Sequence, residues 1–233
     1  MLLLFDIDGT LLRERAVPVA GAMSAALREV HGVQTSEIRT RIETTGRTHG
    51  EIARAILADA GVTGERIDAG AAAVCDLTCQ AWAREAPDDL SDAVLPGVRG
   101  LLDWLGGLPD VRLAQLTGNY EAIAWLKLER AGIDGWFERG QGAFGSDADD
   151  RDELPAIARR RAGTSGAPYP RGQTIVIGDT PKDIECARAD RVRCVAVASG
   201  SFGVESLADA DVVVGDAEGL RVAFEELVSR PAG

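Results

Sequence analysis

Two aspartates spaced two residues apart stand near the start of the chain. Asp6 and Asp8 follow a short apolar run, Leu2 to Phe5, and precede Gly9 and Thr10. A carboxylate at the carboxyl end of a buried parallel strand lies where open α/β sheets bind their ligands. Because Gly9 favours a turn, we expect both carboxylates on the turn that ends the strand. Such a pair can divide catalysis between an ionised nucleophile and an acid or base, although aspartate and glycine are also ordinary turn residues.

A second polar group, Thr117-Gly118-Asn119, comes at the end of another predicted strand, Val111 to Leu116. A helix is predicted to start directly after it, from about Tyr120 to Ala131. Free amides at a helix N-terminus attract phosphate, and the threonine hydroxyl adds a further donor. Thr117-Gly118-Asn119 therefore predicts a binding site for a phosphoryl group.

A third group, Gly178-Asp179-Thr180-Pro181-Lys182-Asp183, also follows a predicted strand. Thr180 and Pro181 suit the N-cap and first positions of a helix. That arrangement holds Asp179 just above the strand and places Asp183 one turn into the helix.

The first and third groups together supply oxygen ligands. Asp6, Asp179 and a backbone carbonyl near Asp8 would form an oxygen-rich set. Hard oxygen ligands with room for water suit Mg²⁺.

The elements that must position these groups fall into two kinds. Between about residues 13 and 92 the sequence predicts helix after helix, over Ala22–Val30, Glu51–Ala60 and Asp68–Arg84, from residues that favour helices. After Leu95-Pro96-Gly97 comes an apolar helical stripe, and then strands and helices alternate.

The alternating part has further strands and helices besides those already named. Strands are predicted over Phe137–Gly140, Thr174–Ile177, Cys194–Ala198 and Val212–Val214, and helices over Leu154–Ala162, Lys182–Ala189 and Glu218–Val228. Alternation of this kind predicts an α/β fold with a parallel sheet and crossover helices, into which the helical block is inserted after the first strand.

Composition narrows the classes of partner. The 233-residue chain carries a net charge of −12, which argues against nucleic acid or an anionic membrane as the main partner. Its four cysteines form no C-x-x-C pair and are interpreted as reduced thiols of a cytoplasmic protein. His31 and His49 are the two histidines, too few for a histidine-rich zinc site. The apolar start is interrupted by Asp6 and Asp8 too early for a signal peptide or a membrane span.

The three groups, in this order and each after a strand, resemble three of the four signature motifs of the haloacid dehalogenase-like hydrolase superfamily. The resemblance covers Met1 to Arg13 and about Leu95 to Val228, and the helical block resembles the mobile cap of phosphoglycolate-phosphatase-like members. It implies a Rossmann-like α/β core of residues 1–14 and 95–233, with a parallel sheet and an inserted all-helical cap of residues 15–94.

The resemblance also implies roles for individual residues. Asp6 would attack phosphorus and become an aspartyl phosphate, and Asp8 would act as acid and base while its backbone carbonyl binds the metal. Thr117, with Gly118 and Asn119, would hold the phosphoryl group. Asp179 and Asp183 would serve the Mg²⁺ site, Asp179 as a ligand and Asp183 by orienting the metal's other ligands.

The family's remaining motif is normally a lysine between the second and third groups described here. The chain has two lysines: Lys127 lies in the interior of a predicted helix and Lys182 lies within the last group. Arg151, which follows a Gly-Ser-Asp run at the start of a helix, is our candidate instead. The alternative is a surface arginine in an acidic loop.

The turn Thr45-Gly46-Arg47-Thr48-His49 precedes a predicted helix and resembles the cap loop that closes over the substrate in this family. Arg47 would meet a second anionic group of the substrate, and His49 would donate a proton. The alternative is a helix-start turn with solvated side chains.

These expectations favour a Mg²⁺-dependent phosphatase that hydrolyses a small phosphorylated metabolite through an aspartyl phosphate. A phosphomutase shares every core motif and is the closest alternative. Asp8 argues against a dehalogenase, and the lack of lysine between Arg13 and Asp92 argues against a phosphonatase, which needs a cap lysine for a Schiff base. A non-catalytic binding module is disfavoured by the complete set of aspartates. The sequence leaves the oligomeric state open.

Overall fold

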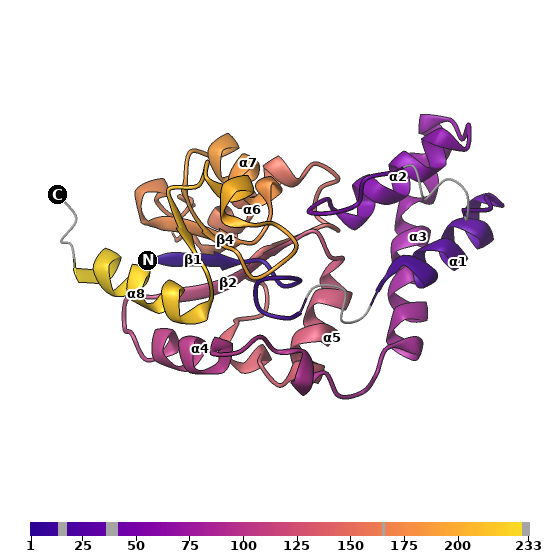
Figure 1. The fold of residues 1–233 in the computed structure, drawn as a ribbon. Helices are drawn as coiled ribbons and strands as arrows, with labels where there is room; N and C mark the ends of the chain where they lie inside the picture. Colours follow the sequence, from indigo (N-terminus) through magenta and orange to yellow (C-terminus); the bar gives the residue numbers. More distant parts are fainter. Residues whose placement is uncertain (14–17, 36–41, 165, 230–233) are drawn as a thin grey trace.

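The computed structural model describes residues 1–13, 18–35, 42–164 and 166–229. Six parallel strands form one sheet in the order β3-β2-β1-β4-β5-β6. The strands are β1 (Leu2–Phe5), β2 (Arg112–Thr117), β3 (Ala143–Phe144), β4 (Thr174–Gly178), β5 (Arg193–Val197) and β6 (Val212–Val214). The order reverses at β1, so the first strand lies at the centre of the sheet, between β2 and β4 (Figure 1).

Alternate residues of β1 face opposite sides of the sheet, as a strand requires. Leu3 and Phe5 join one buried apolar cluster and Leu2 and Leu4 join another. Helices cover both clusters, which explains why all four residues of the strand are apolar. On the side of Leu3 these are α4 (Val98–Gly106), α5 (Glu121–Ala131) and α8 (Ala217–Ser229), and on the side of Leu2 they are α6 (Leu154–Ala162) and α7 (Pro181–Ala189).

Three helices form a separate unit beyond the carboxyl ends of the strands (Figure 1). They are α1 (Ala20–His31), α2 (His49–Asp59) and α3 (Gly64–Glu85), and they share their own apolar cluster. The end of α3 joins the sheet side through Ala81 and Trp82, which are buried with residues of α5. We call α1–α3 the helical unit.

The chain enters and leaves the helical unit through two adjacent segments. The Arg13 amide donates to the Ala93 carbonyl, and the Leu95 amide donates to the Leu11 carbonyl. The predicted border between residues 14 and 15 lies outside the described residues, and the division into core and cap stays a prediction.

Short 3-10 turns connect several of these elements. They are η2 (Ser91–Ala93), η3 (Asp134–Trp136), η4 (Arg151–Glu153), η5 (Arg171–Gln173) and η6 (Val204–Leu207).

The strand predicted over Phe137–Gly140 is wrong. That segment follows the turn η3, and Phe137 packs edge-on against Phe5 with ring centroids 6.4 Å apart. The strand at this edge is instead β3, whose two residues pair with Leu116 and Thr117. Phe137 is apolar because it fills the core and not because it pairs in the sheet.

The other predicted strands and helices are found, with ends that differ by a few residues. All four cysteines are free thiols, as expected from their spacing. Among the described residues, no helix combines the length and apolar character needed to cross a membrane.

Candidate active site

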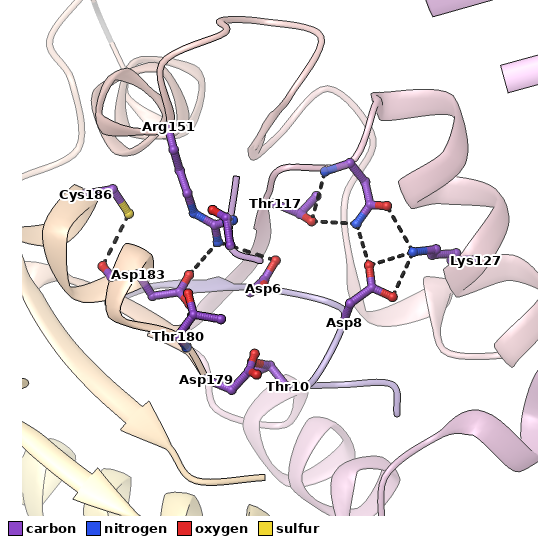
Figure 2. Close-up of polar contacts among 12 residues, drawn as sticks. Asp6, Asp8, Thr10, Thr117, Lys127, Arg151, Asp179, Thr180, Asp183 and Cys186 are labelled. Atoms are coloured by element: carbon purple, nitrogen blue, oxygen red, sulfur yellow. Dashed lines mark hydrogen bonds and ion pairs between the residues drawn. The ribbon is translucent and has the colours of Figure 1, made fainter. Parts of the chain in front are cut away.

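The order of the strands in the sheet brings the three polar groups together at the edge formed by the carboxyl ends of the strands. Strand β1 pairs with β2 on one side and β4 on the other, and all three run parallel. Their carboxyl ends therefore lie side by side. Asp6 follows β1, Thr117 ends β2 and Asp179 follows β4 (Figure 2).

Three carboxylates converge at this edge. One oxygen each of Asp6, Asp179 and Asp183 lies within 4.8 Å of the other two, and all three residues are buried. Buried carboxylates repel one another unless cations balance them. An all-oxygen donor set of this kind fits a hard divalent cation such as Mg²⁺.

Helix α7 positions Asp183 through its N-terminal cap. Thr180 is the N-cap and Pro181 the first helical residue, as predicted. The amide and hydroxyl of Thr180 donate to Asp183 Oδ2 at 3.0 and 2.8 Å. This capping box fixes the carboxylate and leaves its other oxygen directed toward Asp6 and Arg151 (Figure 2).

The turn after β1 is shaped around Asp179. Gly9 has φ +91°, and a Cβ atom at this position would lie 2.2 Å from Asp179 Oδ2. Glycine is therefore required both by the backbone conformation and by the space available. The adjacent Thr10 hydroxyl donates to Asp179 Oδ1 at 3.1 Å, which ties the two strand ends together.

Arg151 lies between two of the carboxylates and the helical unit. Its Nη2 atom is 2.5 Å from Asp183 Oδ1 and 3.6 Å from Asp6 Oδ1. Its Nη1 atom donates to the Gly46 carbonyl, in the turn before α2, at 3.0 Å. The side chain is 4% exposed, so these ion pairs are shielded from water.

The pKa of Asp6 is raised to about 7. Burial is the main cause, and the charges of Asp183 and Asp8 add to it, while Arg151 opposes the shift. Asp6 is therefore only partly ionised at neutral pH, and full ionisation needs more positive charge than Arg151 supplies.

Asp8 lies in a separate polar cluster. Lys127 Nζ is 2.5 Å from Asp8 Oδ2 and 2.7 Å from Oδ1, and Asn119 Nδ2 donates to Oδ2 at 2.8 Å. Lys127 also donates to Asn119 Oδ1 at 2.9 Å. Burial would raise the pKa of Asp8, but the charge and hydrogen bonds of Lys127 and Asn119 outweigh it and hold the pKa below its usual range.

Asn119 connects this cluster to Thr117. Its side-chain and backbone N–H groups both donate to Thr117 Oγ1, at 2.8 and 3.3 Å. Because the Thr117 oxygen accepts these two bonds, its own proton can be given to a bound oxygen.

The turn before α2 contacts the ends of the strands. The His49 amide donates to the Gly118 carbonyl at 2.8 Å, and the Tyr120 amide donates to His49 Nδ1 at 3.2 Å. The Thr48 hydroxyl caps α2 and donates to the Asp149 carbonyl at 2.5 Å. These bonds hold the helical unit against the polar groups.

A cavity of about 450 Å³ lies between the helical unit and the strand ends. Asp6, Asp8, Asp179, Thr117 and Arg151 line it from the sheet side. Residues of α1, α2 and the turn before α2 line it from the other side. Its volume is within the range of sites for small molecules.

The model of the family described as haloacid dehalogenase-like hydrolase matches residues 3–188. This match covers most of the chain. The chain belongs to the haloacid dehalogenase-like hydrolase family. No curated protein sequence matches it.

Several solved structures share the fold. A hydrolase from Pseudomonas syringae is 21% identical, with a TM-score of 0.65 over 97% of this chain and 98% of that one. A β-phosphoglucomutase from Clostridium difficile is 17% identical, with a TM-score of 0.65 over 98% and 99%. A predicted phosphatase from Clostridium acetobutylicum is 16% identical, with a TM-score of 0.64 over 97% and 98%. At such low identity these likenesses establish the fold alone.

Among the residues considered for the family's lysine motif, Arg151 lies near the carboxylates and Lys182 does not. Lys182 is 44% exposed and pairs with Glu185 at 2.5 Å on the outside of α7. The alternative of a surface arginine in an acidic loop is wrong, because Arg151 is buried and paired with Asp183.

Lys127 is a residue that the sequence analysis missed. The sequence predicts a position in the interior of a helix, yet the ammonium group of Lys127 reaches the Asp8 carboxylate. A signal was present, because Ala124, Leu128 and Ala131 place Lys127 beside the buried face of α5. A lysine there requires an anionic partner.

Arg47 and His49 both line the cavity, and each also has a partner within the protein. Arg47 Nε pairs with Glu51 at 2.8 Å, so its charge is already compensated, which does not favour contact with a second anionic group. Burial and the charge of Lys127 lower the pKa of His49 to about 3, although Asp8 opposes this. His49 is therefore neutral near pH 7, with its proton on Nε2 because Nδ1 accepts from Tyr120.

Proposed function

We propose that this hydrolase is a Mg²⁺-dependent phosphatase that acts on a small phosphorylated metabolite through an aspartyl phosphate on Asp6. The observation that most supports it is the convergence of Asp6, Asp179 and Asp183 within 4.8 Å. The free thiols support the cytoplasm as its location.

Asp6, Asp179 and Asp183, with the Asp8 backbone carbonyl, would hold the metal. Arg151 brings one positive charge to the three carboxylates, and the raised pKa of Asp6 reflects the remaining negative charge. A bound divalent cation would supply charge that lets the Asp6 carboxylate ionise and approach a phosphate dianion.

The side chains divide the reaction into two steps. In the first, an Asp6 oxygen attacks phosphorus, the bond to the leaving oxygen breaks, and a proton from Asp8 passes to that oxygen. In the second, Asp8 takes a proton from water, and the water oxygen displaces Asp6 from phosphorus. Asp8 must carry a proton when the first step begins. The Lys127 ion pair stabilises the ionised form of Asp8 that the first step leaves and the second step requires.

The phosphoryl oxygens would be held by groups from the end of β2 and from the turn η4. Thr117 supplies a hydroxyl proton, Gly118 and Asn119 supply the start of α5, and Arg151 supplies a guanidinium beside Asp6. The helical unit, as the predicted cap of residues 15–94, would exclude water from the cavity.

A hydrolysis assay tests the proposal. The wild type should release phosphate from p-nitrophenyl phosphate with Mg²⁺, lose activity in chelator and regain it when Mg²⁺ is restored. Asp6→Asn should lower turnover by orders of magnitude. Full activity in chelator, or near-normal activity of Asp6→Asn, would contradict it.

A phosphomutase remains the alternative, because it shares the same core groups and β-phosphoglucomutases are among the structural neighbours. Incubation with hexose phosphates separates the two. Formation of an isomeric hexose phosphate faster than free phosphate would favour the mutase.

A further inference from the structure

Part of the cavity wall on the side of the helical unit is apolar. Ile52 and Ile56 lie one turn apart on α2, and Met23 of α1 and Val19 before it lie beside them at the cavity. All four also belong to buried apolar clusters, so the packing of the helices fixes their positions. This wall faces the carboxylates across the cavity, where the leaving group of a phosphate ester must lie.

The positive charges at the cavity already have partners. Arg47 pairs with Glu51, Lys127 with Asp8 and Arg151 with Asp183. His49 is neutral near pH 7, as described above. Among the described residues that line the cavity, these contacts provide no uncompensated cation for a second anionic group of a substrate.

We infer that the substrate is a phosphate monoester whose leaving group is a neutral alcohol with a hydrocarbon body. This inference rests on the proposed phosphatase function and adds a substrate class to it. A carboxylate or a second phosphate against Met23, Ile52 and Ile56 would lose its hydration without gaining a counter-ion. A hydrocarbon body would instead gain from burial of its surface.

The polar groups of this wall suit a neutral substrate as well. His49 carries its proton on Nε2, and Thr44 and Thr45 also line the cavity. Such groups can bond one hydroxyl or ether oxygen of the leaving group without any charge.

Three non-hydrolysable phosphonates of equal chain length provide the test. They are n-butylphosphonate, 4-phosphonobutanoate, which carries a carboxylate at the far end, and 3,4-dihydroxybutylphosphonate, which carries two hydroxyls there. Titration calorimetry with the Mg²⁺-loaded protein should give a Kd for n-butylphosphonate at least about tenfold lower than for 4-phosphonobutanoate, with the diol between them. Equal or tighter binding of 4-phosphonobutanoate, or no binding of n-butylphosphonate, overturns the inference.

Two matched substitutions locate the effect. Valine and threonine have nearly the same shape, so Ile52→Thr compared with Ile52→Val changes only polarity at the wall. Ile52→Thr should weaken n-butylphosphonate binding several-fold more than Ile52→Val does. The same pair at Ile67, which is buried in the helical unit but does not line this cavity, should show no such difference. A difference of equal size at both positions would contradict the inference.

Turnover separates this inference from the proposed function. Hydrolysis of n-butyl phosphate and of its carboxylate-ended counterpart at equal rates would overturn the substrate class and leave the phosphatase proposal intact. Selective binding of n-butylphosphonate without hydrolysis of any ester would instead leave the apolar site intact and contradict the phosphatase proposal.

Discussion

Lys127 and Asp8 form an ion pair of 2.5 Å in the candidate site, although 119 residues separate them in the chain. If the pair keeps Asp8 ionised, Lys127→Met should lower kcat about 100-fold or more, in line with the loss of a catalytic acid or base. The sign of the pH effect follows from the lowered pKa of Asp8. Without Lys127 that pKa rises, so the acidic limb of the kcat profile should move to higher pH.

The control for this prediction is the other lysine. Lys182→Met removes the same charge from the surface of α7 and should leave kcat and its pH profile near those of the wild type. An unchanged acidic limb in Lys127→Met would limit Lys127 to a structural role.

Arg151 is our proposed counterpart of the family's lysine motif. Arg151→Ala should cost roughly 3 kcal/mol of transition-state stabilisation, like other lost electrostatic donors. The loss in kcat/KM should be similar for every phosphate ester, because the contact is to the transferred group. Arg151→Lys should restore part of it, since lysine supplies a charge but cannot reach both Asp183 and the Gly46 carbonyl with a planar fork. Loss confined to esters with large leaving groups would speak against this role.

Asp6 makes the stability of the metal-free protein depend on pH. Its pKa is about 7 in the folded protein and has its usual, lower value when the chain unfolds. The folded state therefore holds the proton more tightly, and its stability should fall as pH rises from about 4 to about 7. In Asp6→Asn, residue 6 has no titrating group. In chelator, the Tm of this variant minus the Tm of the wild type should therefore increase across this pH range and then level off. A constant difference from pH 4 to pH 8 would contradict the raised pKa.

The contact between the turn before α2 and the end of β2 depends on Gly118. A Cβ atom there would lie 2.3 Å from the Arg47 carbonyl oxygen, which belongs to the backbone and cannot turn aside. Gly118→Ala should therefore displace the turn, break the bond from the His49 amide, and cost roughly 1–3 kcal/mol of stability. Chemical denaturation measures this cost. Gly135→Ala, where a Cβ would meet open space, is the matched control and should be close to neutral.

Elements with strong local signals were predicted from the sequence. Thr180 and Pro181 define the start of α7 through capping, and β1 is predicted by its apolar run, because both depend on adjacent residues. Strand β3 was not predicted, since its two residues become a strand only by pairing with β2.

The features of the site also differ in whether they could be predicted from the sequence. The placement of Asp6, Thr117 and Asp179 at one edge follows from strand ends in a parallel sheet. The reach of Lys127 to Asp8 depends on how α5 packs against the turn after β1, which no short segment encodes. The Arg47–Glu51 ion pair, in contrast, has helical i, i+4 spacing and could have been predicted from the sequence.

At the scale of the whole molecule, the acidic site connects parts of the chain that are far apart in sequence. Asp6 follows the first strand, whereas Asp179 and Asp183 follow β4 and start α7. A cation shared by these carboxylates would relieve their repulsion and join both segments only when the chain is folded. Binding to the folded state alone adds about 2.7 kcal/mol of stability when the free ligand is at 100 times its Kd.

Mg²⁺ should therefore raise the Tm of the wild type above its value in chelator, and the increase should grow with the logarithm of the Mg²⁺ concentration. Asp179→Asn should lose most of this increase, because it removes one of the three charged ligands. Glu205→Gln, an exposed carboxylate of η6, is the control and should keep it. Thermal unfolding followed across a Mg²⁺ titration, without any substrate, measures the effect independently of catalysis. An equal Mg²⁺ response in wild type and Asp179→Asn would mean that the cation binds elsewhere on this acidic protein.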